Sequence, residues 1–128
     1  MGFIKEIGFN LTDISEGYAK GELELTSIHA NPIGSTHGGV IFSIADTVGG
    51  AAASSRGRFV TTVSGNINYL SPAMNCTKLI GESREIKVGN KMCVYEVTIT
   101  NEQDRVIAVA TMTFFYLDKK GKIEESDK

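Results

Sequence analysis

The amino-acid sequence predicts an α+β fold, in which an antiparallel sheet of about five to six strands wraps around one long buried helix. Three observations lead to this prediction. Residues 40–55 carry apolar or very small side chains on every side, as a helix buried all round does. Residues 19–28 alternate between apolar and polar side chains, the period of a half-exposed strand. At least four more strand-like segments follow the helix, joined mainly by short turns.

The first predicted strand, residues 19–28, follows a short N-terminal segment. Leu23 and Leu25 would face one side of the sheet, and the glutamates between and before them the other. A glycine-punctuated loop then leads into the helix. The helix is expected to end at Arg56-Gly57-Arg58, because glycine suits the left-handed residue after a helix and cations suit its negative end. The small residues 49–53 would admit either the backbone of the sheet or a second subunit.

The remaining strands are predicted from their alternation and their turns. Residues 59–70 form one strand, stopped by a Ser-Pro pair. Residues 77–88 and 91–100 form a hairpin closed by Gly89-Asn90, a pair that tolerates positive φ. Residues 105–117 are almost continuously apolar and β-branched, which indicates an interior strand. In residues 59–70, the predicted polar face comprises Ser64, Asn66 and Asn68, opposite Val63, Ile67 and Tyr69.

Length and composition limit the class of protein. A chain of 128 residues with 41% hydrophobic residues fits one domain spanning 1–128. No apolar run reaches the roughly 18 residues of a bilayer helix, and the N-terminus lacks a signal-peptide pattern, so we expect a cytoplasmic protein with no membrane partner. A net charge of -2 offers no general attraction for nucleic acid. Cys76 and Cys93 lack metal-ligand spacing, so no metal site is expected.

Two features near the start of the helix indicate chemistry. Gly38-Gly39 lies where the helix should begin, and the first N–H groups of a helix have no internal acceptor and can stabilise an oxyanion. Asp46 is the only carboxylate in the apolar run, and burying it would cost several kcal/mol unless it is paired or functional. The plainer alternatives are an ordinary loop-to-helix junction, and an Asp46 bonded to Ser43, Thr47 or a neighbouring strand.

Helix geometry limits how these two features could cooperate. Asp46 lies about seven residues into a helix that starts near Gly39, roughly 10 Å from the first amides. One subunit would therefore hold them too far apart to act on one ligand. Two antiparallel copies related by a two-fold axis would bring Asp46 of one chain close to the Gly38 amide of the other. We therefore expect a homo-oligomer, a dimer at minimum.

These residues resemble a known family. The pattern N-P-x-G-x-x-H-G-G, followed after six residues by Asp, resembles the PaaI-like group of hotdog-fold acyl-CoA thioesterases. The segment VSGNINYLSPA resembles a strand of that family, and residues 89–117 resemble its last two strands. The resemblance spans nearly the whole chain, apart from about the first 15 residues and those after Leu117.

The resemblance implies roles for five residues. Asp46 matches the carboxylate that attacks the thioester or activates water, and Gly38 matches the amide that polarises the thioester carbonyl. Asn31 and His37 match residues that shape the loop and position the thioester or the water. Ser64 matches a hydroxyl that assists from the same side as Asp46. Each has a structural alternative: His37 could only fix its loop, Asn31 could be a turn residue, and Ser64 could only bond a neighbour.

The same resemblance implies a coenzyme A ester as substrate, with no separate cofactor and no metal. The family members are commonly tetramers built from two dimers. Basic groups and a hairpin should meet the phosphates of CoA, although any one of these cations could be ordinary solvated surface charge. The predicted CoA-contacting residues are Arg56, Arg58, Arg84, Val88, Gly89 and Lys91.

The predicted function is hydrolysis of a small aromatic or medium-chain acyl-CoA to the free acid and CoA. Orientation and oxyanion stabilisation are its main demands, because a thiolate leaves readily. Two alternatives stay open. One is an acyl-CoA binding or sensing module without turnover. The other is a MaoC-like enoyl-CoA hydratase, which the position of His37, nine residues before Asp46, disfavours.

Overall fold

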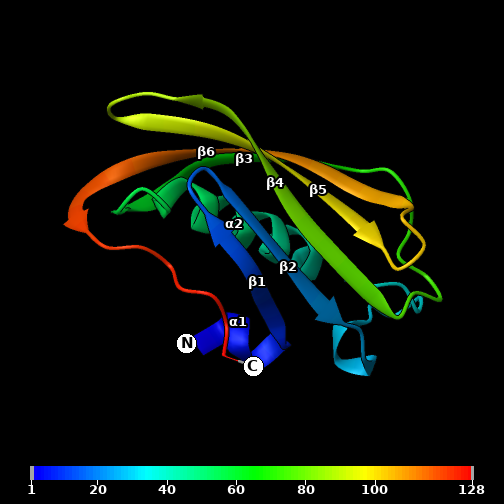
Figure 1. Ribbon diagram of the computed structural model, residues 1–128. Helices are drawn as coiled ribbons and strands as arrows, with labels where there is room; N and C mark the ends of the chain where they lie inside the picture. Colours follow the sequence, from blue (N-terminus) through cyan, green and yellow to red (C-terminus); the bar gives the residue numbers. More distant parts are fainter. Residues whose placement is uncertain (1, 128) are drawn as a thin grey trace.

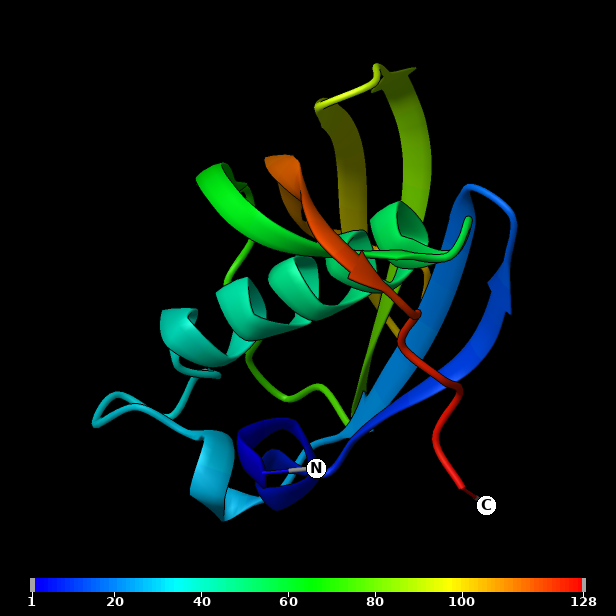
Figure 2. The ribbon, with the colours of Figure 1, turned by 90° about the vertical axis from the view of Figure 1, so that its left-hand side faces the viewer.

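The computed structural model describes residues 2–127, which form one antiparallel sheet and one long helix. Its elements are α1 (Gly2–Ile7), β1 (Phe9–Ser15), β2 (Tyr18–Glu24), a 3₁₀ turn (Ser27–His29), α2 (Gly38–Ser54), β3 (Arg58–Tyr69), β4 (Lys78–Val88), β5 (Met92–Asn101) and β6 (Val106–Lys120). The strand order is β1-β2-β4-β5-β6-β3. Figures 1 and 2 show the sheet curving around α2, so the predicted α+β architecture is confirmed.

The local predictions agree with most of these boundaries. The helix starts at Gly38, within the Gly38-Gly39 pair where its start is predicted, and the β4–β5 hairpin and the interior strand β6 are confirmed. The strand predicted over 19–28 is shorter, because the chain turns into the 3₁₀ segment after β2. Strand β1 was not predicted, although Phe9 and Leu11 face the core and alternate with exposed Asn10 and Thr12.

Close packing of α2 against the concave face of the sheet fixes the position of the helix. Gly81 of β4 faces α2, and a Cβ atom at this position would lie 2.7 Å from Ile44 Cγ2. A Cβ at Gly49 of α2 would lie 3.0 Å from the ring of Phe114 on β6. Neither glycine leaves room for a side chain, so the backbones approach closely and α2 cannot shift without a clash. No helix of residues 2–127 is long and apolar enough to span a membrane.

The two edges of the sheet differ. At the β1 edge, residues 121–127, here called the C-terminal strap, run back across the strand, and Leu11 exchanges two hydrogen bonds of 2.8 and 2.9 Å with Ser126. The red segment in Figure 1 follows this course from β6 toward α1. At the opposite edge β3 is largely uncovered, and Val63 and Tyr69 are 52% and 51% exposed. Within residues 2–127, β3 is therefore the edge strand that is left free over a long stretch.

An ion-pair cluster fixes the chain where α2 ends. The Arg56 guanidinium lies 2.8 Å from Glu85 on β4 and 3.3 Å from Glu16 in the β1–β2 turn. The hydroxyl of buried Tyr95 donates to Glu85 at 2.9 Å and accepts from Arg56 at 3.2 Å. The Arg56 hydrogen bond lowers the pKa of Glu85, and burial raises the pKa of Tyr95. This cluster ties the end of α2 to strands β4 and β5.

Replacing Glu85 with Gln should lower the free energy of unfolding by about 1 kcal/mol at pH 7, because solvent screens a pair that is one-third exposed. The folded pKa of Glu85 lies below its ordinary value of 4.5, so its charge stabilises the fold above that pH. The difference between wild type and Glu85→Gln should therefore shrink as the pH falls below 4.5. Urea unfolding across this range measures it, and a difference independent of pH would contradict the assignment.

Candidate active site

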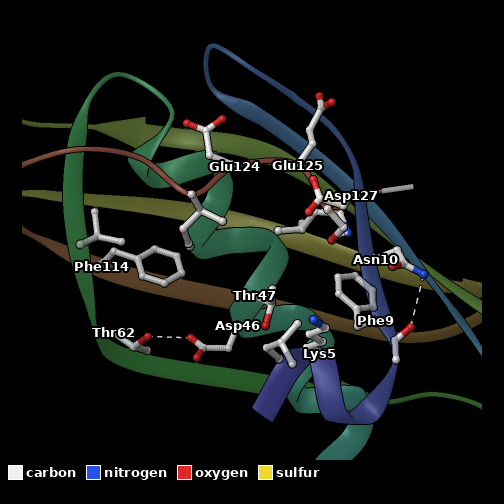
Figure 3. A pocket seen from close by; sticks show the side chains of 17 residues that line it. Lys5, Phe9, Asn10, Asp46, Thr47, Thr62, Phe114, Glu124, Glu125 and Asp127 are labelled. Atoms are coloured by element: carbon white, nitrogen blue, oxygen red, sulfur yellow. Dashed lines mark hydrogen bonds between the residues drawn. The ribbon is translucent and has the colours of Figure 1, made fainter. Parts of the chain in front are cut away.

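Asp46 lies on a half-buried face of α2, beside the edge strand β3. Its carboxylate Oδ1 accepts a 2.6 Å hydrogen bond from the hydroxyl of Thr62 on β3 (Figure 3). No other hydrogen bond reaches this carboxylate among residues 2–127. The expectation that Asp46 is buried among apolar side chains is therefore wrong, because the side chain is only half-buried. The alternative of a bond to a neighbouring strand is observed, and it leaves the second oxygen of the carboxylate available.

A cavity of about 560 Å³ adjoins this carboxylate. Figure 3 shows it between α2, β3, α1, β1 and the C-terminal strap. Its volume falls within the range of pockets that hold small organic ligands. The apolar side chains that line it are Ile4, Phe9, Leu11, Val60, Phe114 and Ile123.

The predicted position of Ser64 beside Asp46 is wrong. Ser64 pairs with Thr113, and the next residue, Gly65, faces α2, so Ser64 points to the outer side of the sheet. The strand register shifts between Thr62 and Ser64, which reverses the alternation at this point. The hydroxyl that reaches Asp46 is that of Thr62, a contact that the alternation along the strand does not predict.

The first turn of α2 is held by side chains on both sides of Gly38. The His37 ring accepts at Nδ1 a 2.8 Å hydrogen bond from the Gly39 N–H and so caps the helix. The Tyr69 hydroxyl donates to the Gly38 carbonyl at 2.9 Å, and burial raises the pKa of this hydroxyl. Among residues 2–127 no acceptor is found for the Gly38 N–H. This amide lies at a second cavity, of about 330 Å³.

Asn31 closes the loop that precedes the helix. Its side-chain oxygen accepts from the N–H groups of Ile33 and Ser35, both at 3.1 Å. Its side-chain nitrogen donates to the Ser35 hydroxyl at 2.8 Å. Both polar atoms of the side chain are thus engaged within the loop, as expected for a turn residue. In this chain Asn31 fixes the conformation of the loop that leads to Gly38.

Gly38 and Asp46 lie apart within one chain. Eight residues of α2 separate them, which corresponds to about 12 Å along the helix axis. They also line different cavities. One chain therefore presents the carboxylate and the free amide at two separate places.

Of the residues predicted to contact CoA, two cations are paired within the chain. Arg56 belongs to the cluster with Glu85, and Arg84 lies 3.2 Å from Glu96. Arg58 lies at the β4–β5 hairpin, where it donates to the carbonyl of Asn90 at 3.3 Å. Val88, Gly89 and Lys91 are exposed in that hairpin. The structure thus gathers Arg58, Val88, Gly89 and Lys91 at one place and places Arg56 and Arg84 in ion pairs.

Comparison with known families agrees with this geometry. Residues 33–108, which include His37, Gly38 and Asp46, match the thioesterase superfamily. The chain belongs to this superfamily. It is a thioester hydrolase, and its resemblance to the PaaI-like hotdog thioesterases is confirmed.

Individual relatives align with most of the length of this thioesterase. An Archaeoglobus fulgidus protein, named provisionally as an esterase, is 32% identical over 109 residues, or 85% of this chain and 71% of that one. The Escherichia coli acyl-coenzyme A thioesterase PaaI is 29% identical, over 82% of this chain and 75% of its own. A Streptococcus mutans structure solved with acetyl CoA superposes with a TM-score of 0.84 at 29% identity, covering 89% of this chain and 92% of that one.

Replacing His37 with Ala should lower the free energy of unfolding by about 1 kcal/mol, because the Gly39 N–H loses its acceptor. His37→Asn should retain most of that stability, since Asn caps helix starts well. Urea unfolding of the three proteins gives the comparison. Equal stabilities of His37→Ala and wild type would show that the cap contributes nothing.

Proposed function

We propose that this thioesterase hydrolyses acyl-CoA esters at a site that joins Asp46 of one chain to the Gly38 N–H of a second copy. The observation that carries the proposal is the Asp46 carboxylate at the wall of a cavity, with one oxygen held by Thr62 and the other available. A carboxylate so placed can activate water or attack a carbonyl. The relatives named as acyl-CoA thioesterases support a CoA ester as substrate.

In the proposed reaction, the oxygen of water attacks the thioester carbonyl carbon while Asp46 accepts a proton. The negative charge that develops on the carbonyl oxygen is stabilised by the Gly38 N–H at the positive end of α2. The C–S bond then breaks, and the electron pair leaves with the sulfur of CoA, which takes up a proton. A direct attack by Asp46, followed by hydrolysis of the anhydride, gives the same products. Neither route requires a metal or a cofactor.

Thr62 positions the carboxylate in either route. Its hydroxyl donates to Oδ1 at 2.6 Å, so it fixes the rotation of the Asp46 side chain. A carboxylate held by one oxygen presents the other in a constant direction to the reacting atom. Because Thr62 contacts Asp46 and not the substrate in this account, it is a positioning residue.

The second copy is proposed from the free edge of β3. Residues 61–66 are all exposed, and the strand contains no Pro and no Lys, the residues that protect natural sheet edges. Pairing of β3 with its symmetry-related copy would continue the sheet across a two-fold axis. It would also place two α2 helices side by side at the junction. Association of two such dimers into a tetramer is proposed from the family resemblance.

The CoA moiety is proposed to leave the site along the β4–β5 hairpin. Arg58 and Lys91 supply positive charge there, and neither has an ion-pair partner among residues 2–127. The Gly89 and Asn90 backbone forms the tip of this hairpin. An exposed phosphate contact contributes about 1 kcal/mol, so each cation should affect KM more than kcat.

Release of free CoA from a panel of acyl-CoA esters tests the reaction. Wild type should hydrolyse them, Asp46→Asn should lower kcat by about a thousandfold or more, and Thr62→Val should lower it by about tenfold, the loss of one hydrogen bond. Ser64→Ala is the matched control, because its hydroxyl lies on the outer side of the sheet. Full turnover in Asp46→Asn would remove this residue from the mechanism. Water addition to an enoyl-CoA without ester cleavage would indicate a hydratase instead.

Mixing two inactive variants tests the shared site. Asp46→Asn removes the carboxylate. Gly38→Pro removes the N–H at the first helical position, where proline is tolerated, and places a Cβ 3.3 Å from the Tyr69 hydroxyl. Mixed dimers contain one intact site, so unfolding and refolding the two variants together should restore about a quarter of the wild-type activity. Each variant refolded alone should stay inactive. Absence of any recovery, with mixed dimers present by sedimentation, would place both groups of the site in one chain.

A further inference from the structure

Two neighbouring glycines in α2 differ in their surroundings. At Gly49 a Cβ would lie 3.0 and 3.1 Å from the Phe114 ring and 3.5 Å from Val97, so packing excludes a side chain. At Gly50 the only heavy atom within 4 Å of a Cβ would be Phe114 Cε1, at 3.8 Å, an ordinary contact. Gly50 also has a helical backbone, which alanine favours. Neither packing nor backbone conformation in this chain therefore requires glycine at position 50.

The missing side chain at Gly50 leaves space in the cavity beside Asp46. Gly50 follows Asp46 by four residues, so both lie on the same face of α2, and both line this cavity. Ile4 of α1, Phe9 of β1 and Ile123 of the C-terminal strap line the same cavity. A group bound beside the carboxylate can therefore reach Gly50 and these apolar side chains within one cavity.

The charges around this cavity are mostly negative. Among its lining residues, Glu124, Glu125 and Asp127 add to Asp46, and Lys5 is the only cation. Such a field disfavours an anionic group inside the cavity. The apolar lining favours hydrocarbon.

We infer that Gly50 sets the depth of the acyl pocket, and that this pocket accepts an apolar, uncharged acyl group. The inference rests on the proposed function, because it takes the cavity beside Asp46 as the place of the acyl chain. The C-terminal strap forms part of the cavity wall. Ile123 is held there by its N–H, which donates to the Ser54 hydroxyl at 3.3 Å. Gly50 is thus a specificity-determining residue. Glycine at this position makes the helix less stable than alanine would, but it leaves space in the cavity for the acyl group.

Four proteins and a graded ester panel test this inference. Gly50→Ala should raise the melting temperature by roughly 3 °C, because alanine favours the helix. It should also lower the ratio of kcat/KM for decanoyl-CoA to that for acetyl-CoA by about tenfold, since one methyl group occupies the pocket. Ile123→Ala should raise that ratio. Ile80→Ala is the control, because Ile80 lies on the outer face of the sheet, next to the inward Gly81, and should leave the ratio unchanged.

Charge selection is measured in the same panel. Hexanoyl-CoA should be hydrolysed at least about tenfold faster, by kcat/KM, than glutaryl-CoA, which ends in a carboxylate. Equal rates for these two esters would overturn the assignment of an uncharged acyl group. An unchanged decanoyl-to-acetyl ratio in a stabilised Gly50→Ala would overturn the role of Gly50.

A binding measurement separates this inference from the proposed reaction. Decanamide, an uncharged mimic of the acyl group, should bind wild type in calorimetry, and Gly50→Leu should lose that binding while retaining its circular dichroism spectrum. If wild type cleaves no CoA ester but binds decanamide in a Gly50-dependent way, the proposed function fails and the pocket stands. If wild type cleaves esters but neither Gly50→Ala nor Gly50→Leu changes chain-length preference or decanamide binding, only the pocket assignment fails.

Discussion

The contact between α2 and the concave face of the sheet determines where this thioesterase can hold a carboxylate. Gly81 and Gly49 bring the backbones so close that a single added carbon would clash with Ile44 or Phe114. Most residues of α2 are buried by this contact. A charged side chain can therefore occupy only the part of α2 that this contact leaves partly exposed, and there Asp46 lies at a cavity and meets Thr62 of the edge strand β3. The charge avoids the desolvation of a sheet-covered position.

The main elements were predictable because local patterns specify them. The apolar run predicted α2, and the Gly-Asn turn predicted the β4–β5 hairpin. The loop motif and the residues after it likewise predicted Gly38 and Asp46 as candidate site residues. The error over Ser64 has a different origin. Alternation along β3 holds from Tyr69 back to Ser64, but one extra residue, Val63, reverses the faces before Thr62. A bulge is set by pairing with β6, which periodicity within one strand cannot reveal.

Features that depend on distant contacts were not predicted either. The C-terminal strap has no secondary structure of its own, and it is placed by bonds to β1, more than 100 residues earlier in the chain. The charge of Arg56 suggests a contact with CoA. In the structure Arg56 instead bonds to Glu85 and Tyr95, which come together only when β4 and β5 are paired. The distinction between Gly49 and Gly50 likewise depends on where the Phe114 ring lies. Sequence identified the residue types, and tertiary contacts decided their roles.

The strap also connects the site with the proposed assembly of two chains. It occupies the β1 edge of the sheet through hydrogen bonds to Leu11 and Ile14, and its Ile123 lines the cavity beside Asp46. One segment thus blocks unwanted strand addition and shapes the pocket. Because β1 is blocked while β3 is free, edge pairing can join only like edges around a two-fold axis. Such pairing closes after two chains instead of propagating, and it acts at the edge that carries Thr62, the partner of the carboxylate.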